Sequence, residues 1–260
     1  MFSLTLEASV VERDELVAEL FEAGTTGITE EEDWIRAFFD DSSDSQDLLR
    51  RFSAYKPHLH HEEERDWIEY MRDQWHPFPV GDKFFLVPEW RDDPAPGQRL
   101  RLRIYPGRAC GTGTHPATQL CLLALERHLL EGHSVLDVGT GAGILAEGAR
   151  LLGADPVWAC DIDHESTLVA RQNLSQSPFP IFLFTGSVRS VRARSVDLIV
   201  ANLNLATLDT IARDLLRIVR EHGLLVLSGF EESEEAKVEA LVQRPAKDRM
   251  ELDGYSCLVF

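Results

Sequence analysis

A glycine-rich turn between two apolar runs constrains the fold more than any other segment. The run 135–138 leads into Gly139-x-Gly141-x-Gly143, and a helical pattern follows directly. Glycine allows the backbone to turn tightly there and allows a ligand to approach the main chain closely. Asp161 ends the next apolar run, where a carboxylate can accept both hydroxyl protons of a ribose. The pattern predicts a strand, turn, helix and strand that bind a nucleotide or nucleoside cofactor.

Strand and helix patterns alternate from about residue 107 onward, which predicts a parallel sheet with helices on both faces. The last two β-type runs, 249–252 and 255–260, are separated only by Asp253-Gly254, which is a hairpin signal. A doubly wound α/β sheet that ends in an antiparallel hairpin suits a methyltransferase better than a dehydrogenase. The predicted strands are 134–138, 157–161, 181–184, 196–201 and 224–228, and the predicted helices are 119–130, 142–152, 165–174, 205–219 and 231–242.

Residues 2–60 show a different order: strand, helix, two strands, helix and strand. Residues 2–6 alternate as a strand, and the apolar residues of 10–23 have a helical spacing that Gly24 ends. Short β-type runs at 25–29 and 34–39, a helix at 44–52 and a last strand within 53–60 complete the order. This order predicts a small ferredoxin-like α+β domain.

The segment 61–106 separates these two regions. A charged helix is predicted for 62–74 and ends before Pro77 and Pro79, and β-type runs at 84–87 and 100–105 flank a proline-rich loop. We therefore expect three parts. They are a ferredoxin-like domain at 1–60, a linker helix with a hairpin at 61–106, and the cofactor-binding sheet domain at 107–260.

The charge of the chain limits its partners. With 26 basic and 44 acidic residues the net charge is −18, which repels nucleic acid unless a local basic patch exists, so we expect no direct nucleic-acid binding. No apolar run is long enough to cross a membrane, and the first residues lack the features of a secretion signal. The four cysteines show neither metal-ligand spacing nor a disulfide pattern, so we expect a cytoplasmic protein without a bound metal.

The spacing of the turn distinguishes between two cofactor classes. A dinucleotide turn has Gly-x-Gly-x-x-Gly and faces a diphosphate with a helix N-terminus. Here the third glycine comes one residue early, and Asp137 stands where a diphosphate would be repelled. A carboxylate suits S-adenosylmethionine, which carries a sulfonium and an ammonium group. We expect S-adenosylmethionine as the cofactor, with contacts from five residues of this segment: Asp137, Gly139, Gly141, Gly143 and Asp161.

A second polar segment, 111–118, precedes the turn. Its glycines and hydroxyls form a loop with many hydrogen-bond donors, and it includes Thr114 and His115 before a predicted helix. Taken alone, the segment is typical of a plain helix start that is capped by Thr118 or Thr114.

A third polar position, Asn202, ends the fourth parallel strand. The carboxyl ends of the strands form the ligand crevice in such sheets, so the amide of Asn202 is placed to meet a cofactor or an attacking amine. No proline or aromatic residue follows Asn202 to stack a flipped base. This argues against a nucleobase substrate.

Together these segments resemble the ribosomal protein L11 methyltransferase family over nearly the whole chain, and the glycine–threonine–histidine loop is the most family-specific of them. The matching segments are Asp66-Trp67, 77–81, 87–90, Pro106-Gly107, 111–118, the glycine turn, 161–163 and 200–202. The resemblance implies that an N-terminal ferredoxin-like domain recognises ribosomal protein L11, and that a flexible linker moves the catalytic domain over its lysines and N-terminal amine. It further implies cofactor contacts at Thr118, Gly139, Asp161 and Asn202.

The chain departs from the family pattern at Cys110, where phenylalanine is usual, and at Phe230. Two alternatives therefore stay open: methylation of another protein or a small molecule, and cofactor binding without catalysis or with a nicotinamide. A free lysine has a pKa of about 10.4, so roughly one molecule in two thousand is neutral at pH 7. Desolvation and proton loss to water suffice without a dedicated base. Asn202, His115 and Thr114 are the candidates for orienting the amine.

Overall fold

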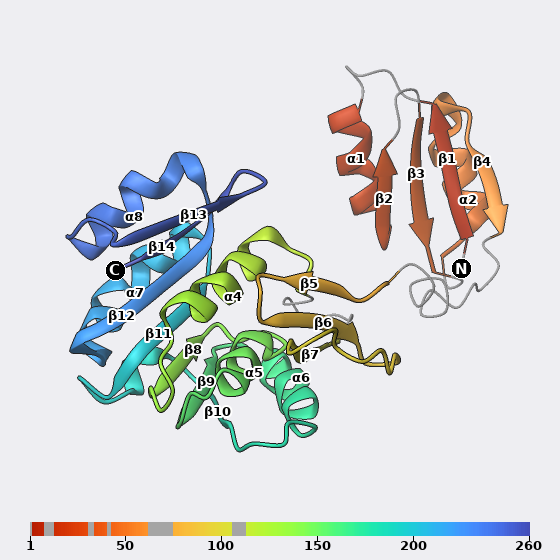
Figure 1. Cartoon of the computed structure of the whole chain (residues 1–260). Helices are drawn as coiled ribbons and strands as arrows, with labels where there is room; N and C mark the ends of the chain where they lie inside the picture. The colour runs from red at the N-terminus through yellow and green to blue at the C-terminus, as the bar shows by residue number, and fades with distance from the viewer. Residues whose placement is uncertain (1, 8–12, 31–33, 41–42, 62–74, 106–112) are drawn as a thin grey trace. The chain divides into compact units, whose positions relative to one another are not determined.

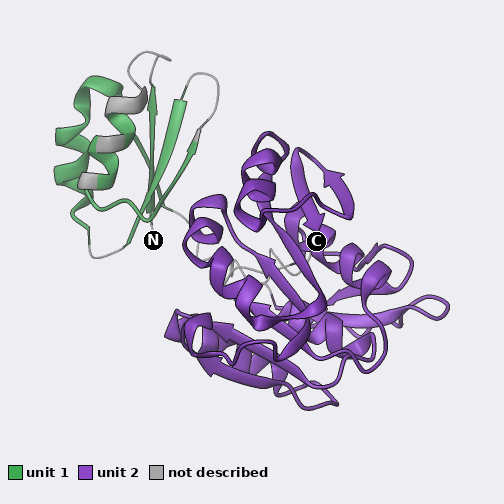
Figure 2. Ribbon diagram, turned by 90° about the vertical axis from the view of Figure 1, so that its left-hand side faces the viewer, with its two compact units in different colours: residues 1–74 green, residues 75–260 purple. Residues whose placement is uncertain are grey.

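The computed structural model describes residues 2–7, 13–30, 34–40, 43–61, 75–105 and 113–260 (Figure 1). The chain divides into two compact units, residues 1–74 and 75–260 (Figure 2). The helix expected at 62–74 lies outside the described residues. None of the helices described is long and apolar enough to span a membrane.

The first unit is a four-stranded sheet with two helices, in the order strand, helix, two strands, helix, strand. Its strands lie in the order β2-β3-β1-β4, and each neighbouring pair is antiparallel. Alternate strand residues such as Leu4, Ile35 and Phe39 form a core with Leu20 and Phe52 from the helices. The elements are β1 (Phe2–Glu7), α1 (Arg13–Glu22), β2 (Gly27–Glu30), β3 (Trp34–Phe39), α2 (Ser45–Arg51) and β4 (His58–His61).

The second unit contains a seven-stranded sheet in the order β10-β9-β8-β11-β12-β14-β13. Strands β8 to β12 are parallel, and β14 runs antiparallel to both of its neighbours, as the hairpin signal predicts. Its strands are β8 (Val135–Val138), β9 (Val157–Asp161), β10 (Phe182–Thr185), β11 (Val196–Asn202), β12 (Val219–Glu231), β13 (Asp248–Leu252) and β14 (Tyr255–Val259). Its helices are α4 (Pro116–His128), α5 (Ile144–Leu151), α6 (His164–Leu174), α7 (Leu205–Ile218) and α8 (Glu235–Val242).

Helices cover both faces of this sheet. Residues such as Val135 and Val200 face one way and form a core with α4 and α5, whereas Leu136 and Ile199 face the other way and pack against α7 and α8. Both faces are apolar because a parallel sheet is buried on both sides. The strand order reverses between β8 and β11, so the carboxyl edge beside this pair is where such sheets bind ligands.

A three-stranded sheet precedes the large one and belongs to the same unit. It consists of β5 (Phe78–Val80), β6 (Phe84–Pro88) and β7 (Leu100–Ile104). We expected β6 and β7 to form a hairpin in a linker, but they pair in parallel, and the antiparallel pair is β5 with β6. In the structure Phe84 and Leu86 are fully buried in the core that α4 and α5 share, so residues 75–104 pack as part of the second unit.

Several element boundaries differ from the expected ones, and two of these differences have a clear structural cause. Helix α5 starts at Ile144 rather than residue 142, because Gly143 has a φ of 92° and still belongs to the turn. Strand β12 extends to Glu231, and α8 starts only at Glu235 after a short 3-10 turn, because β14 continues to pair with β12 as far as Glu231.

Candidate cofactor and methyl-transfer site

The glycine turn joins β8 to α5 at the carboxyl edge of the large sheet. Gly139, Gly141 and Gly143 have φ values of 71°, 52° and 92°, a region that residues with a Cβ rarely adopt. A Cβ added at Gly139 would lie 2.5 Å from Cδ2 of Leu203 in the loop after β11. The turn therefore requires glycine for its backbone conformation and for the close approach of that loop.

Asp137 lies beneath the turn, on the face that α4 and α5 cover. Its buried Oδ2 accepts hydrogen bonds from Oγ1 of Thr140 at 2.6 Å and from the N–H of Ala146 at 3.1 Å. Burial raises the pKa of Asp137 to about 7, although these two hydrogen bonds lower it. Its Oδ2 thus fixes the turn and the first residues of α5, whereas its buried Oδ1 has no hydrogen-bond partner among the described residues.

Asp161, at the end of β9, is hydrogen-bonded directly to the turn. Its Oδ2 accepts from the N–H of Gly141 at 3.1 Å, and its Oδ1 accepts from the N–H of Asp163 at 3.0 Å. Each carboxylate oxygen keeps a lone pair for a further donor. Gly139, Gly141 and Asp161 line one cavity of about 720 Å³, a size within the range of small-molecule and cofactor sites.

Asn202 brings the end of β11 to the same cavity. It is one of the lining residues, and its Nδ2 donates to Oγ1 of Thr118 in the first turn of α4 at 3.1 Å. A Cβ at Gly229 would lie 2.8 Å from Oδ1 of Asn202, so the glycine of β12 makes room for this side chain. The structure thus brings together two predicted residues that lie 84 positions apart.

His115 has a structural task that the sequence did not suggest. Its Nδ1 accepts from the N–H of Ala117 at 3.2 Å and caps α4, in place of Thr114 or Thr118. The ring packs edge-on against Tyr255, with 4.6 Å between centroids. Because Nδ1 accepts a hydrogen bond, a neutral ring carries its proton on Nε2. The carbonyl oxygen of Thr114 accepts from Nε2 of Gln119 at 2.9 Å. Neither His115 nor Thr114 lines the cavity.

Several lining residues were not among the predicted ones. Ile162 follows Asp161 and is 78% exposed, which is unusual for an isoleucine and places an apolar surface at the cavity wall. Ser187, Val188 and Arg189 form another wall, and the first turns of α7 contribute Thr207, Thr210 and Ile211. The loop after β10 carries three arginines, Arg189, Arg192 and Arg194, but no glycine-rich motif that would have marked it as part of a cofactor site.

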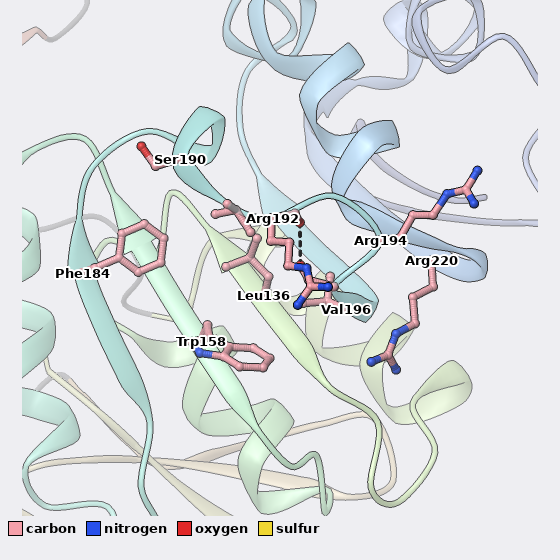
Figure 3. Close-up of a pocket in the computed structure, with 10 residues that line it drawn as sticks. Leu136, Trp158, Phe184, Ser190, Arg192, Arg194, Val196 and Arg220 are labelled. Carbon is pink, nitrogen blue, oxygen red and sulfur yellow. Dashed lines mark hydrogen bonds between the residues drawn. The ribbon is translucent and has the colours of Figure 1, made fainter.

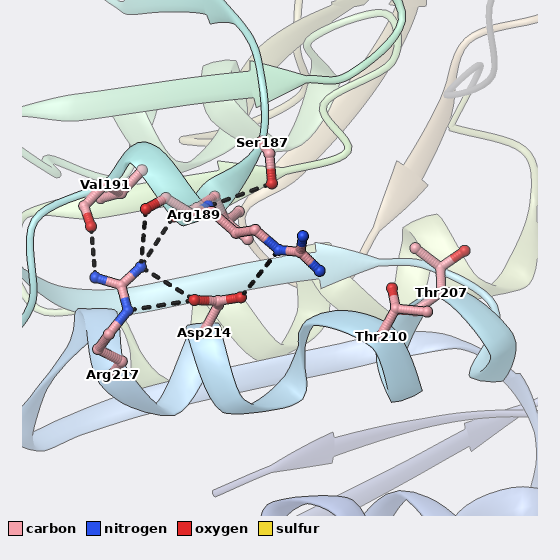
Figure 4. A network of polar contacts seen from close by, with 8 residues as sticks. Ser187, Arg189, Val191, Thr207, Thr210, Asp214 and Arg217 are labelled. Carbon is pink, nitrogen blue, oxygen red and sulfur yellow. Dashed lines mark hydrogen bonds and ion pairs between the residues drawn. The ribbon is translucent and has the colours of Figure 1, made fainter.

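A polar network holds that wall in place (Figure 4). The guanidinium of Arg217 on α7 donates to the carbonyl oxygens of Val191 at 2.7 Å and Val188 at 3.3 Å. It also bonds Asp214 at 3.2 Å, and Asp214 lies 3.7 Å from the guanidinium of Arg189. The short 3-10 helix η2 (Val188–Ser190) is therefore fixed against α7.

The charges of the cavity suit a ligand that combines a cation with a ribose. Asp161 and Asp163 line it, with Arg189 as the one basic lining residue among those described. Asp137 adds a third carboxyl group below the turn. The cleft between the turn and the loops after β9 and β10 supplies both backbone groups and the apolar surface of Ile162 for the rest of a nucleoside.

The described cysteines are free thiols, and Cys110 lies outside the described residues. Cys160 lines the cavity at the end of β9, where burial raises the pKa of its thiol to about 12. A hydrogen bond with Cys257 and burial also raise the pKa of Cys121. These thiols are protonated at neutral pH and serve as apolar wall and core.

The strand order, the antiparallel final hairpin and the turn opposite Asp161 define a class I S-adenosylmethionine-dependent methyltransferase fold. The profile of the family described as ribosomal protein L11 methyltransferase (PrmA) matches residues 2–258. The chain belongs to that family and is a methyltransferase.

Individual relatives agree with this assignment. The chain is 38% identical over 208 residues to the ribosomal protein L11 methyltransferase of Desulfosudis oleivorans, across 76% of this chain and 68% of that protein. It is 32% identical over 249 residues to that of Hydrogenovibrio crunogenus, across 92% and 83%. A crystal structure of ribosomal protein L11 methylase from Lactobacillus delbrueckii superposes with a TM-score of 0.65 at 31% identity, across 71% of this chain and 96% of that one.

Proposed function

We propose that this methyltransferase transfers methyl groups from S-adenosylmethionine to amino groups of ribosomal protein L11. Lysine side chains are the acceptors, with the N-terminal amine as a further candidate. The observation that carries the proposal is a single cavity lined by the glycine turn, Asp161 and Asn202, together with the substrate named for the family and its relatives.

Different lining residues contact different parts of the cofactor. The backbone of Gly139 and Gly141 lets the cofactor approach closely, and the free lone pairs of Asp161 accept from the ribose hydroxyls. Ile162 and Val188 provide apolar surface for the adenine, since both line the cavity on the side of β9 and β10. When bound, S-adenosylmethionine supplies an electrophilic methyl group on a sulfonium.

Asn202 orients the acceptor amine. Its Nδ2 is held by Thr118, which leaves Oδ1 to accept a hydrogen bond from the incoming amine. The amine loses its proton to water before it enters, because an apolar wall disfavours the charged form. Thr114 and His115 precede α4 on the same side as Thr118, and their segment helps to position the substrate.

The first unit recognises the substrate. Its element order and its strand order β2-β3-β1-β4 support a ferredoxin-like domain. In this view residues 1–60 bind ribosomal protein L11, and the segment that follows lets the catalytic domain reach several amines. A ribosomal protein as substrate places the reaction in the cytoplasm.

Labelling tests the proposal. The full chain is incubated with purified ribosomal protein L11 and S-adenosylmethionine that carries a labelled methyl group, and the modified residues are mapped by mass spectrometry. We expect label on L11 lysines, and much less label with Asp161→Asn at a cofactor concentration near the wild-type Kd. If a cell extract yields label on another protein or a small molecule while L11 stays unlabelled, the substrate assignment is wrong. If the chain binds S-adenosylhomocysteine and labels nothing, it binds the cofactor without catalysis.

A further inference from the structure

A second cavity lies beside η2, next to the cofactor cavity. Its volume is about 700 Å³, and none of its described lining residues also lines the cofactor cavity. Ser187 to Arg189 face the cofactor cavity, whereas the residues from Ser190 onward face the second one. The lining that matters here consists of Leu136, Trp158, Phe184, Arg192, Arg194 and Arg220 (Figure 3).

The cavity exists because one connection in the sheet lacks a long helix. Helices α5, α6 and α7 link the other consecutive parallel strands, and each has between 8 and 14 residues. Between β10 and β11 the chain forms only η2, of three residues. The part of the sheet at β9 and β10 is therefore left without a covering helix on the face that α7 and α8 cover elsewhere.

Aromatic side chains form the floor of this uncovered region. Trp158 of β9 and Phe184 of β10 line the cavity. Phe182, two residues before Phe184 and so on the same face, is 52% exposed and lies 6.2 Å from Trp158 between ring centroids. Trp158 and Phe184 are half-buried, and the faces that they leave open in the cavity are a stacking surface for a planar ligand.

Cations form the other end of the cavity. Figure 3 shows the aromatic residues toward one end and the three arginines toward the other. Arg220 is paired with Asp197 at 2.5 Å, but Arg192 and Arg194 have no acidic partner among the described residues. None of the described lining residues is acidic. In a chain of net charge −18 this is a local concentration of positive charge.

Backbone hydrogen bonds hold the loop that carries Arg192 and Arg194 in one conformation. Arg194 has a φ of 50°, and its N–H donates to the carbonyl oxygen of Arg217 at 2.9 Å. The next N–H, of Ser195, donates to Ile218 at 2.8 Å. Arg217 also holds the other side of the loop through Val191, as described above. A ligand that binds here does not have to order the loop first.

We propose that this second cavity binds a nucleoside phosphate, with the base on Trp158 and Phe184 and the phosphate on Arg192 and Arg194. Guanidinium groups form paired hydrogen bonds with phosphate oxygens, and the aromatic floor accepts any base. The net charge favours a small ligand over a long nucleic acid, because a polyanion that extends beyond the cavity is repelled by the rest of the surface.

Calorimetry with ADP tests the proposal on the full chain saturated with S-adenosylhomocysteine. We expect one ADP per chain, with adenosine and inorganic pyrophosphate each binding at least tenfold more weakly. The double variant Arg192→Gln/Arg194→Gln weakens ADP at least tenfold, and Trp158→Leu weakens it at least fivefold. The matched control, Arg171→Gln on the exposed surface of α6, leaves ADP binding unchanged. Each variant must keep its affinity for S-adenosylhomocysteine, which shows that it is folded.

Any one of the following results would overturn the proposal. The first is the absence of saturable ADP binding, and the second is binding that S-adenosylhomocysteine displaces, which would place ADP in the cofactor cavity. The third is pyrophosphate that binds as tightly as ADP, or an unchanged affinity in Trp158→Leu, since either would mean that only charge is recognised. None of these results depends on whether ribosomal protein L11 is the substrate.

Discussion

Asn202 at the end of β11 and Thr118 in the first turn of α4 are joined by a hydrogen bond of 3.1 Å from Nδ2 to Oγ1. Thr118 is only 2% exposed, so its hydroxyl has little access to water as an alternative partner. The bond links the edge of the sheet to α4, the helix that follows the segment 111–115. It fixes which way the amide of Asn202 points, and so which of its atoms is available in the cavity.

Removing that hydroxyl should impair catalysis without unfolding the protein. Thr118→Val keeps the volume and loses the acceptor, so we expect kcat/KM for methyl transfer to fall about two- to tenfold, which is the effect of one hydrogen bond. Thr118→Ser keeps the hydroxyl and serves as the control. Steady-state kinetics with labelled cofactor measures both. An equal loss in the two variants would contradict a role for the bond.

Neutralising Asp161 should weaken cofactor binding. Asp161→Asn keeps the shape but removes the charge that strengthens hydrogen bonds to the ribose, so we expect the Kd for S-adenosylhomocysteine to rise about tenfold to a hundredfold. Calorimetry measures this directly. Asp253→Asn, in the turn between β13 and β14, is the control and should leave the Kd unchanged. An unchanged Kd in Asp161→Asn would contradict the proposal that Asp161 binds the ribose.

Alanine substitutions at two glycines distinguish the destabilisation caused by a left-handed backbone from the destabilisation caused by steric crowding. Gly132 and Gly139 have φ values of 78° and 71°, but only Gly139 has a neighbour, Leu203, where a Cβ would lie. We expect Gly132→Ala to lower the free energy of unfolding by about 1 kcal/mol, and Gly139→Ala by roughly 1–3 kcal/mol more. Urea unfolding measures both. A double-mutant cycle with Leu203→Ala should show coupling, and additivity would contradict the contact.

Asp197 should make stability depend on pH in the acid range. Burial opposes its ionisation, but hydrogen bonds from Ser134 and the guanidinium of Arg220 outweigh this and lower the pKa of Asp197 to about 2. An unfolded aspartate titrates near 3.9, so the ionised form stabilises the fold above about pH 4, and this contribution is lost as the pH falls through about 2.

The corresponding measurement is urea unfolding at several pH values. Asp197→Asn should lower the free energy of unfolding by about 1–2 kcal/mol at neutral pH, and the difference from the wild type should shrink below about pH 4. Asp209→Asn, at an exposed position on α7, should show no such trend. A difference that stays constant with pH would mean that Asp197 acts through packing alone.

Asp137 should couple cofactor binding to proton release. Its pKa of about 7 leaves it partly protonated at neutral pH, and a bound cation favours the ionised form. The affinity for S-adenosylmethionine should therefore rise with pH through about 7, by a factor on the order of ten. Calorimetry in buffers of different ionisation enthalpy counts the protons released. Asp137→Asn should abolish this release, and S-adenosylhomocysteine, which lacks the sulfonium charge, should show less of it.

The alternating pattern of the second unit was predictable because each parallel strand is a short apolar run followed by a helical spacing. The glycine turn and Asp161 were predictable for the same reason, since their spacing is local. The face of a strand on which a given side chain lies was not predictable from the sequence. The contact of Asp137 with the cofactor stays a prediction, whereas its hydrogen bond from Ala146 depends on how α5 packs against β8, which the local pattern does not determine.

Features that depend on contacts between residues far apart in the sequence could not be predicted either. The cap of α4 was expected from a threonine, whereas His115 takes it because its ring is supported by Tyr255, 140 positions away. The cavity wall at 187–189 is set by Arg217 on another element. The charge count of the whole chain gave no hint that Arg192 and Arg194 stand together without acidic neighbours, although both can be read in the sequence.

Strand β14 lies between β12 and β13 although it follows both in the sequence. Ser228 of β12, which pairs with Asn202, donates its hydroxyl to the carbonyl oxygen of Ser256 at 2.7 Å. A growing chain that has reached residue 254 thus contains the glycine turn, Asp161 and Asn202, yet the strand next to Asn202 still has an open edge. The order of synthesis therefore leaves this edge of the sheet incomplete until residues 255–259 have been added.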